Sequence, residues 1–116
     1  MNTIERKAEI VSTTKIIVLP EYRKEWCLTM SALLEMIRRE EGCRTYRLYG
    51  ESGNQNSFML FGEWATRAAL EEHLQSEHFA VLLGSLRLLT KQSKFDFCLL
   101  SHIAGIEALA RARRGS

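Results

Sequence analysis

The spacing of hydrophobic residues predicts a strand followed by a helix in the first third of the chain. Residues 8–19 are rich in Ile and Val, which favours a strand. Pro20 can end that strand and open a helix, because the first helical position needs no amide hydrogen. Over residues 20–41 the apolar side chains recur every three or four positions, which predicts an amphipathic helix with Gly42 as its C-terminal cap.

The middle of the chain predicts a hairpin of two strands. Residues 43–51 alternate between two mixed faces, and residues 57–65 alternate in the same way. The polar cluster between them, residues 52–56, is rich in Ser, Gly and Asn, which is typical of a turn. We therefore expect these two strands to pair with each other.

Two short helices and a last strand follow the hairpin. Thr66 and Ser76 are of the residue types that cap helices, and each precedes a run of apolar residues at helical spacing. The elements predicted here are helices over 67–75 and 77–90, a strand over 93–103 and a short Ala-rich helix over 104–114.

The order strand, helix, strand, strand, helix, strand predicts an α+β fold of the ferredoxin-like type, an antiparallel sheet with helices on one face. Residues 1–116 form one domain in this interpretation, with its core over 8–103 and a basic helix or tail over 104–116. The other sheet face still carries aromatic side chains, and an apolar face left in water is unfavourable in a monomer. We therefore expect a homodimer.

Composition narrows the possible partners. The chain has 116 residues, 46% hydrophobic and 26% charged, which is an ordinary balance for one globular domain. The net charge of +2 is accounted for by residues 105–116 alone, so the body is neutral and no nucleic-acid partner is expected. No apolar stretch approaches the roughly 18 residues of a membrane span. The polar start and the odd cysteine count favour a cytoplasmic protein with reduced thiols, each cysteine acting as a small hydrophobic residue.

Two histidines are the main candidates for chemistry. His73 and His78 are five residues apart, which does not place them on one face of a single helix, but a break at Ser76 would let them converge. His73 could equally be a residue at the edge of the apolar stripe, and His78 could bond to backbone at a helix end. A metal site would need a further ligand, and nothing in the spacing brings the candidates His102, Glu63 and Glu77 together, so no metal is expected.

Several residues of the hairpin could line a pocket. Trp64 could anchor the core or an interface, or it could form the wall of a ligand pocket between sheet and helices. Tyr46 and Tyr49 could pack or could add polar groups to that pocket. Arg47 lies in the middle of a strand, where a charge is unfavourable unless it is solvated or paired, so it could lie at a solvated edge or face a partner subunit.

Residues 41–79 carry a recognisable pattern. A strand ends in Glu63–Trp64, a helix carries A-x-x-x-H-L over residues 69–74, and S-x-H-F follows over residues 76–79. This pattern, with the turn at Pro20, resembles the antibiotic biosynthesis monooxygenase family, and the resemblance covers about residues 8–103. It implies a dimeric α/β barrel in which two ferredoxin-like sheets close face to face.

Relatives in that family include cofactor-free oxygenases of quinols or anthrones, haem-degrading enzymes and isomerases of small signal molecules, and the fold alone does not choose among them. The haem-degrading branch is disfavoured, because Leu83, His73 and Thr13 stand where its axial histidine, tryptophan and asparagine would fall. His73 and His78 match the branch of the quinol oxygenases and the isomerases.

The resemblance therefore implies a cofactor-independent monooxygenase acting on a small aromatic such as a quinol or an anthrone. His73 would be the base, Trp64 would stack on the substrate ring, and Tyr49 or Arg47 would stabilise an oxyanion. His78 would support the site from a helix terminus. No cofactor is expected. An isomerase of the same fold and a non-catalytic ligand-binding module remain the alternatives.

Overall fold

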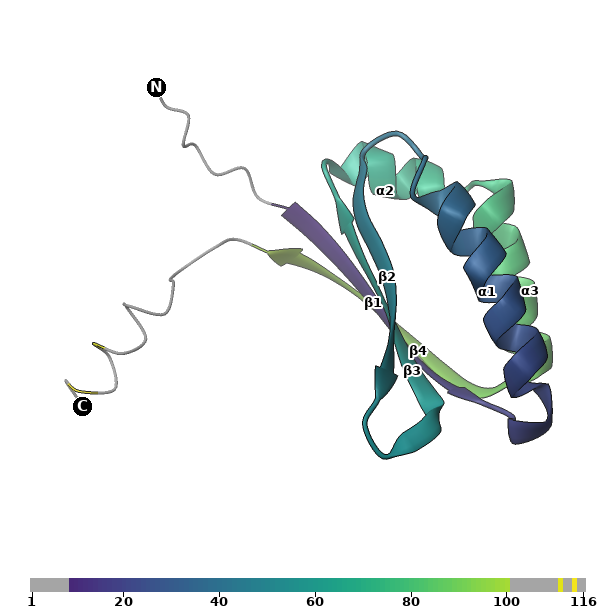
Figure 1. Ribbon diagram of the computed structural model, residues 1–116. Coiled ribbons are helices and arrows are strands. Elements are labelled where there is room, and N and C mark those ends of the chain that lie inside the picture. Colours follow the sequence, from purple (N-terminus) through teal and green to yellow (C-terminus); the bar gives the residue numbers. More distant parts are fainter. Residues whose placement is uncertain (1–8, 101–110, 112–113, 115–116) are drawn as a thin grey trace, which may run out of the picture.

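The computed structural model describes residues 9–100, 111 and 114, and it contains a four-stranded sheet with helices on one side (Figure 1). The elements in chain order are β1 (Glu9–Val18), the 3₁₀ turn η1 (Pro20–Tyr22), α1 (Arg23–Ile37), β2 (Cys43–Glu51), β3 (Asn54–Trp64), α2 (Arg67–Leu74), α3 (Glu77–Leu89) and β4 (Thr90–Leu100).

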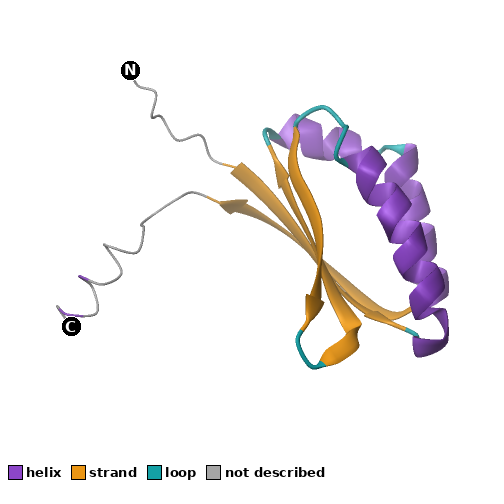
Figure 2. Ribbon diagram, viewed as in Figure 1, coloured by secondary structure: helices purple, strands orange, loops and turns teal. Residues whose placement is uncertain are grey.

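The sheet has the strand order β2-β3-β1-β4, and every pair of neighbours is antiparallel. The helices all lie against one face, and the other face has no covering element among the described residues (Figure 2). This arrangement confirms the predicted ferredoxin-like fold. None of the helices in the described ranges is long and apolar enough to span a bilayer.

The first helix is shorter than the predicted range of 20–41. It opens with the 3₁₀ turn at Pro20, as expected, and α1 then ends at Ile37. Beyond that point the amide of Arg39 bonds to the carbonyl of Met36, and the amide of Glu40 bonds to that of Ile37. These bonds reach back three residues instead of four, so the chain tightens and leaves the helix axis. The last four predicted helical residues form a turn instead.

Gly42 does not cap the helix directly, because the C-cap is Arg38. It has a φ of 82°, a conformation that favours glycine. A Cβ at Gly42 would lie 2.3 Å from the Cβ of Ala69. The glycine therefore allows the turn after α1 to lie directly against α2.

The hairpin is tighter than predicted. Glu51 pairs with Asn54, so the turn contains two residues, of which Gly53 has a φ of 86°. Strand β3 begins three residues earlier than expected, and β4 begins at Thr90 instead of residue 93. Residues 101–103 of the predicted last strand lie outside the described residues, as does the predicted helix over 104–114 except for positions 111 and 114.

The core lies between the sheet and the helices. The apolar stripe of α1 is buried, and burial of each such side chain stabilises the fold by roughly 1.5–3 kcal/mol. Its buried residues are Trp26, Met30, Leu33, Leu34 and Ile37. The largest fully buried side chains are Trp26, Trp64, Ile16, Met30, Ile37, Leu60, Leu82 and Val18.

The strand register fixes which side chains share a face. Tyr46 of β2 lies opposite Gly62 of β3 on the helix-covered face. Arg47 and Tyr49 alternate with Tyr46 along β2 and therefore belong to the open face. Trp64 belongs to the helix-covered face, where it is fully buried.

Candidate functional site

The best-defined polar cluster in the described part of the chain is built around His73, in the last turn of α2. Its side chain is 3% exposed. Its Nδ1 lies 2.7 Å from Oε1 of Glu40, which comes from the turn after α1. A carboxylate has no proton to donate, so Nδ1 carries the proton and the lone pair of the ring lies on Nε2.

Three aromatic rings surround the imidazole of His73. Trp64 stacks on it, with ring centroids 4.5 Å apart and an interplanar angle of 28°. Tyr46 lies tilted at 5.7 Å, and Phe79 presents an edge at 5.2 Å. The imidazole is therefore held in one orientation by apolar contacts on several sides and by one charged hydrogen bond.

The break between α2 and α3 brings the cluster together. Ser76 caps α3 by accepting a hydrogen bond from the amide of Phe79 at 3.1 Å, and its hydroxyl donates to the carbonyl of His73 at 2.7 Å. The C-terminal end of a helix favours a cation, and the N-terminal end favours an anion. His73 lies at the end of α2, and Glu40 lies within reach of the first residues of α3. Both helix termini therefore favour an imidazolium next to a carboxylate.

His78 completes the cluster from the first turn of α3. Its Nδ1 lies 2.9 Å from Oε2 of Glu40, so one carboxylate holds both histidines. The side chain of His78 is 35% exposed, and that of Glu40 is 15% exposed. Together with Met36 and Arg39 they line a surface hollow of about 290 Å³. The prediction that a break at Ser76 lets the two histidines converge is thus confirmed.

Burial and the charge of Glu40 change the pKa of His73 in opposite directions. Burial disfavours the charged imidazolium and lowers the pKa of His73 below 6.5, while the hydrogen bond and the charge of Glu40 partly offset this effect. Burial also raises the pKa of the neighbouring Tyr46. At neutral pH His73 is therefore a neutral base beside a carboxylate that stabilises its protonated form.

Trp64 is fixed in the core by a second polar contact. Its Nε1 donates to Oγ of Ser12 on β1 at 3.3 Å. A Cβ on Gly62 would lie 2.7 Å from this Oγ, 2.8 Å from Cδ1 of Tyr46 and 3.0 Å from Nε1 of Trp64. The glycine is therefore the residue that leaves room for the indole beside the strand.

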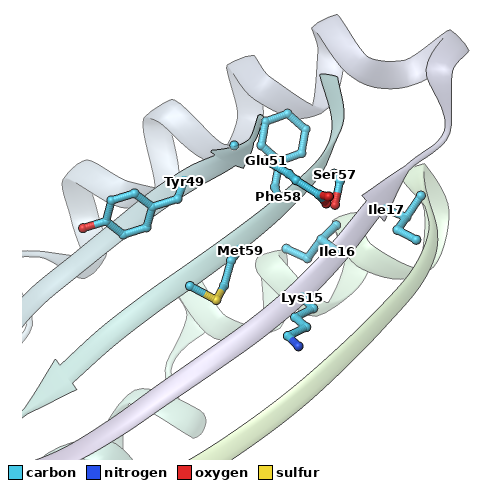
Figure 3. A pocket seen from close by; sticks show the side chains of 9 residues that line it. Lys15, Ile16, Ile17, Tyr49, Glu51, Ser57, Phe58 and Met59 are labelled. Atoms are coloured by element: carbon cyan, nitrogen blue, oxygen red, sulfur yellow. The ribbon is translucent and has the colours of Figure 1, made fainter. Parts of the chain in front are cut away.

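Tyr49 and Arg47 are not part of this cluster. Both are exposed on the open face, on the other side of the sheet from His73. Tyr49 lines a separate hollow of about 490 Å³ at the hairpin end of that face, together with Lys15 and Met59 (Figure 3). The structure therefore brings together His73, His78 and Trp64 but separates them from the other two predicted site residues.

Sequence reasoning missed Glu40. Glu40 and Glu41 follow each other, and nothing in their spacing marks one as special. Two acidic residues just beyond the C-terminal end of a helix are, however, unfavourable for the helix dipole. This position was the only sign in the sequence that one of the two carboxylates is stabilised by a group elsewhere in the chain.

The cysteines and the acidic residues do not supply an alternative site in the described part of the chain. No group of three or more His, Cys, Asp or Glu residues within that part could hold a metal ion. Cys43 is half-buried, and burial raises its pKa to about 11. Its thiol is therefore protonated at neutral pH and is a poor nucleophile.

Fold and site together define a small ferredoxin-like domain with a buried acid–histidine pair. The family model for antibiotic biosynthesis monooxygenase matches residues 10–82. The chain belongs to the antibiotic biosynthesis monooxygenase family.

Several relatives are similar in sequence. A Synechocystis protein, "Uncharacterized protein sll1783", is 36% identical over 70 residues, which cover 60% of this chain and 48% of that protein. "Putative monooxygenase YcnE" of Bacillus subtilis is 34% identical over 70 residues, covering 60% of this chain and 74% of that protein. The chain thus spans about half the length of the Synechocystis relative.

Solved structures agree on the fold. PA3566 from Pseudomonas aeruginosa has a TM-score of 0.74 and 25% identity, covering 86% of this chain and 99% of that one. SnoaB from Streptomyces nogalater, a cofactor-independent oxygenase crystallised as a point mutant, has a TM-score of 0.73 at 18% identity, covering 82% of this chain and 95% of that one. At that identity the similarity to SnoaB supports the fold alone.

Proposed function

We propose that the chain is a cofactor-independent monooxygenase that oxidises a small, electron-rich aromatic such as a quinol or an anthrone, with His73 as the base. The observation that carries this proposal is the hydrogen bond from Nδ1 of His73 to Glu40 inside a ring of aromatic side chains. Membership of a monooxygenase family and the name of YcnE support the reaction class.

The chemistry needs a base and a dry environment, both of which this cluster supplies. Nε2 of His73 takes a proton from the substrate, and Glu40 stabilises the imidazolium that forms. The substrate anion then reduces O₂, and a bond forms between oxygen and the ring carbon. One oxygen atom remains on that carbon, as a carbonyl in the product of an anthrone or as a hydroxyl in the quinone formed from a quinol. The other leaves as water with the two hydrogens that the substrate has lost, one of which His73 returns. Only the substrate and O₂ are consumed.

The aromatic rings around His73 differ in how exposed they are, and this indicates from which side a substrate could approach. Trp64 is fully buried and Tyr46 is 4% exposed, whereas Phe79 is half-buried. Because His73 is itself only 3% exposed, a side chain must move before a substrate reaches Nε2. We place that approach on the Phe79 side. In this proposal Trp64 orients the base by stacking on it, which differs from the sequence-based prediction that it would stack on the substrate ring.

Oxygen uptake tests the proposal. Purified protein is assayed against a panel of quinols and anthrones in parallel with His73→Ala and Trp64→Phe. General-base catalysis contributes about 10²–10⁴-fold, so uptake should fall by that range in His73→Ala. Unchanged turnover in this variant would exclude His73 as the base. Substrate conversion without oxygen would favour an isomerase, and saturable binding without product would favour a binding module.

The roles predicted for Tyr49 and Arg47 are tested in the same assay. The sheet lies between these side chains and His73, so we expect Tyr49→Phe and Arg47→Gln to retain turnover within about threefold, as for surface substitutions away from a site. A loss comparable to that of His73→Ala would support the oxyanion role predicted from the sequence.

We further propose that the open face packs against a second copy of the chain. Ile17 and Tyr49 are 37% and 45% exposed there, and partly buried Met59 and Phe61 extend the apolar area. Sedimentation velocity should give a dimer that Ile17→Glu converts to a monomer. A wild-type monomer at micromolar concentration would contradict this proposal.

A further inference from the structure

The two histidines share a single carboxylate. Oε1 of Glu40 lies 2.7 Å from Nδ1 of His73, and Oε2 lies 2.9 Å from Nδ1 of His78. When only one histidine is protonated, it has the whole charge of the carboxylate. When both are protonated, they divide that charge and repel each other. The protonation of His73 therefore depends on the charge of His78.

The two histidines differ in their access to water. His73 is buried at 3% exposure, while His78 is 35% exposed at the surface hollow beside Arg39. The side chain of His78 therefore contacts solvent, whereas His73 is separated from the solvent by the rings around it. This asymmetry distinguishes an outer histidine from an inner one.

We propose that Glu40 and His78 are positioning residues for His73: Glu40 fixes its tautomer, and His78 competes for the same carboxylate and so sets the pH range in which His73 acts as a base. This inference rests on the proposed function and assigns a regulation to the same site.

The groups that face the two histidines determine whether His78 raises or lowers the pKa of His73. His73 faces Glu40 from the turn after α1, Tyr46 from β2 and His78 from α3. Glu40 raises the pKa of His73, and the nearby charge of His78 lowers it. His78 faces Glu40, and Arg39 lines the same surface hollow. A protonated His78 therefore keeps His73 neutral, and available as a base, at a lower pH.

A titration of the imidazole of His73 by nitrogen-15 NMR tests the competition without any substrate. In His78→Gln the neutral amide can still donate to Glu40 but carries no charge, so the pKa of His73 should rise above the wild-type value. In Glu40→Gln the carboxylate is lost, and the pKa of His73 should fall. Glu41→Gln is the matched control, because Glu41 is the exposed neighbour in the same turn, and the titration should not change.

Opposite shifts in His78→Gln and Glu40→Gln support the proposal. A pKa that does not rise in His78→Gln would overturn it, and so would a shift in Glu41→Gln as large as that in Glu40→Gln. His78→Asn repeats the test if His78→Gln does not fold.

Activity gives a second and separate readout. If the protein oxidises an aromatic, the acid limb of kcat/KM should move to higher pH in His78→Gln, since His73 must be neutral to act. In Glu40→Gln the plateau rate should fall by roughly 10²–10⁴-fold, as when the acidic partner of a catalytic histidine is lost. An acid limb that stays in place would overturn the inference even where the oxidation is observed. Absence of oxygen uptake in the wild type would count against the proposed function only, because the NMR titration decides the competition independently.

Discussion

The two faces of the sheet are built from the same strands but place their polar groups in opposite surroundings. On the helix-covered side, the imidazole of His73 is enclosed by aromatic rings and bonded to Glu40, and burial lowers the pKa of the histidine. On the open face, Arg47 and Tyr49 project from β2 into solvent. Water screens charges and satisfies hydrogen bonds, so unusual acid–base chemistry is expected where water is excluded. The chemistry that we propose therefore lies under the helices, whereas the open face offers apolar area for association.

The largest expected difference between the faces is in stability. Truncating a fully buried aromatic side chain costs about 3–5 kcal/mol, so Trp64→Ala should lower the free energy of unfolding by that amount. In the monomeric Ile17→Glu background, where the open face is in water, Tyr49→Ala should cost less than about 1 kcal/mol. Urea denaturation of both substitutions in that background measures the difference. A loss for Tyr49→Ala as large as that for Trp64→Ala would mean that Tyr49 is packed within the single chain.

A smaller difference in stability is expected when either of two glycines on the helix-covered face is replaced by Ala. An added Cβ at Gly62 would come within 3.0 Å of side-chain atoms of Ser12, Tyr46 and Trp64, and overpacking of this kind costs about 1–3 kcal/mol. A Cβ at Gly50 would meet only ring atoms of Phe58 at 3.9 Å, so Gly50→Ala should stay within about 0.5 kcal/mol of wild type. Thermal unfolding compares the two. Equal melting temperatures would show that the space around Trp64 is not tightly filled.

Much of the fold could be predicted from the sequence because each element carries its own local pattern. The apolar stripe of α1 and the capping residues Thr66 and Ser76 identify their helices from neighbouring positions alone. The end of α1 could not be placed, since the chain leaves the helix at Ile37 while the sequence continues with residues that suit a helix. The close contact of the turn at Gly42 with Ala69 is a tertiary constraint that no local pattern contains.

The candidate site could be predicted only in part, for a related reason. His73 and His78 lie close in sequence, so a helix break was enough to suggest that they converge. Glu40 is 33 residues from His73, and only the packing of α1 against α3 and of the turn against α2 brings it there. Tyr49 and Arg47 were assigned to the site without knowing which face of β2 is buried, and their alternation with the buried Tyr46 places them on the open face.

The central claim is that Glu40 holds the proton of His73 on Nδ1 and leaves Nε2 free as the base. A long-range proton–nitrogen NMR spectrum of His73 above pH 7 measures this tautomer directly. We predict a protonated Nδ1 and an unprotonated Nε2, with the proton on Nδ1 in hydrogen-bond contact with Glu40. A proton found on Nε2 would contradict the account, because His73 would then have no lone pair to offer a substrate.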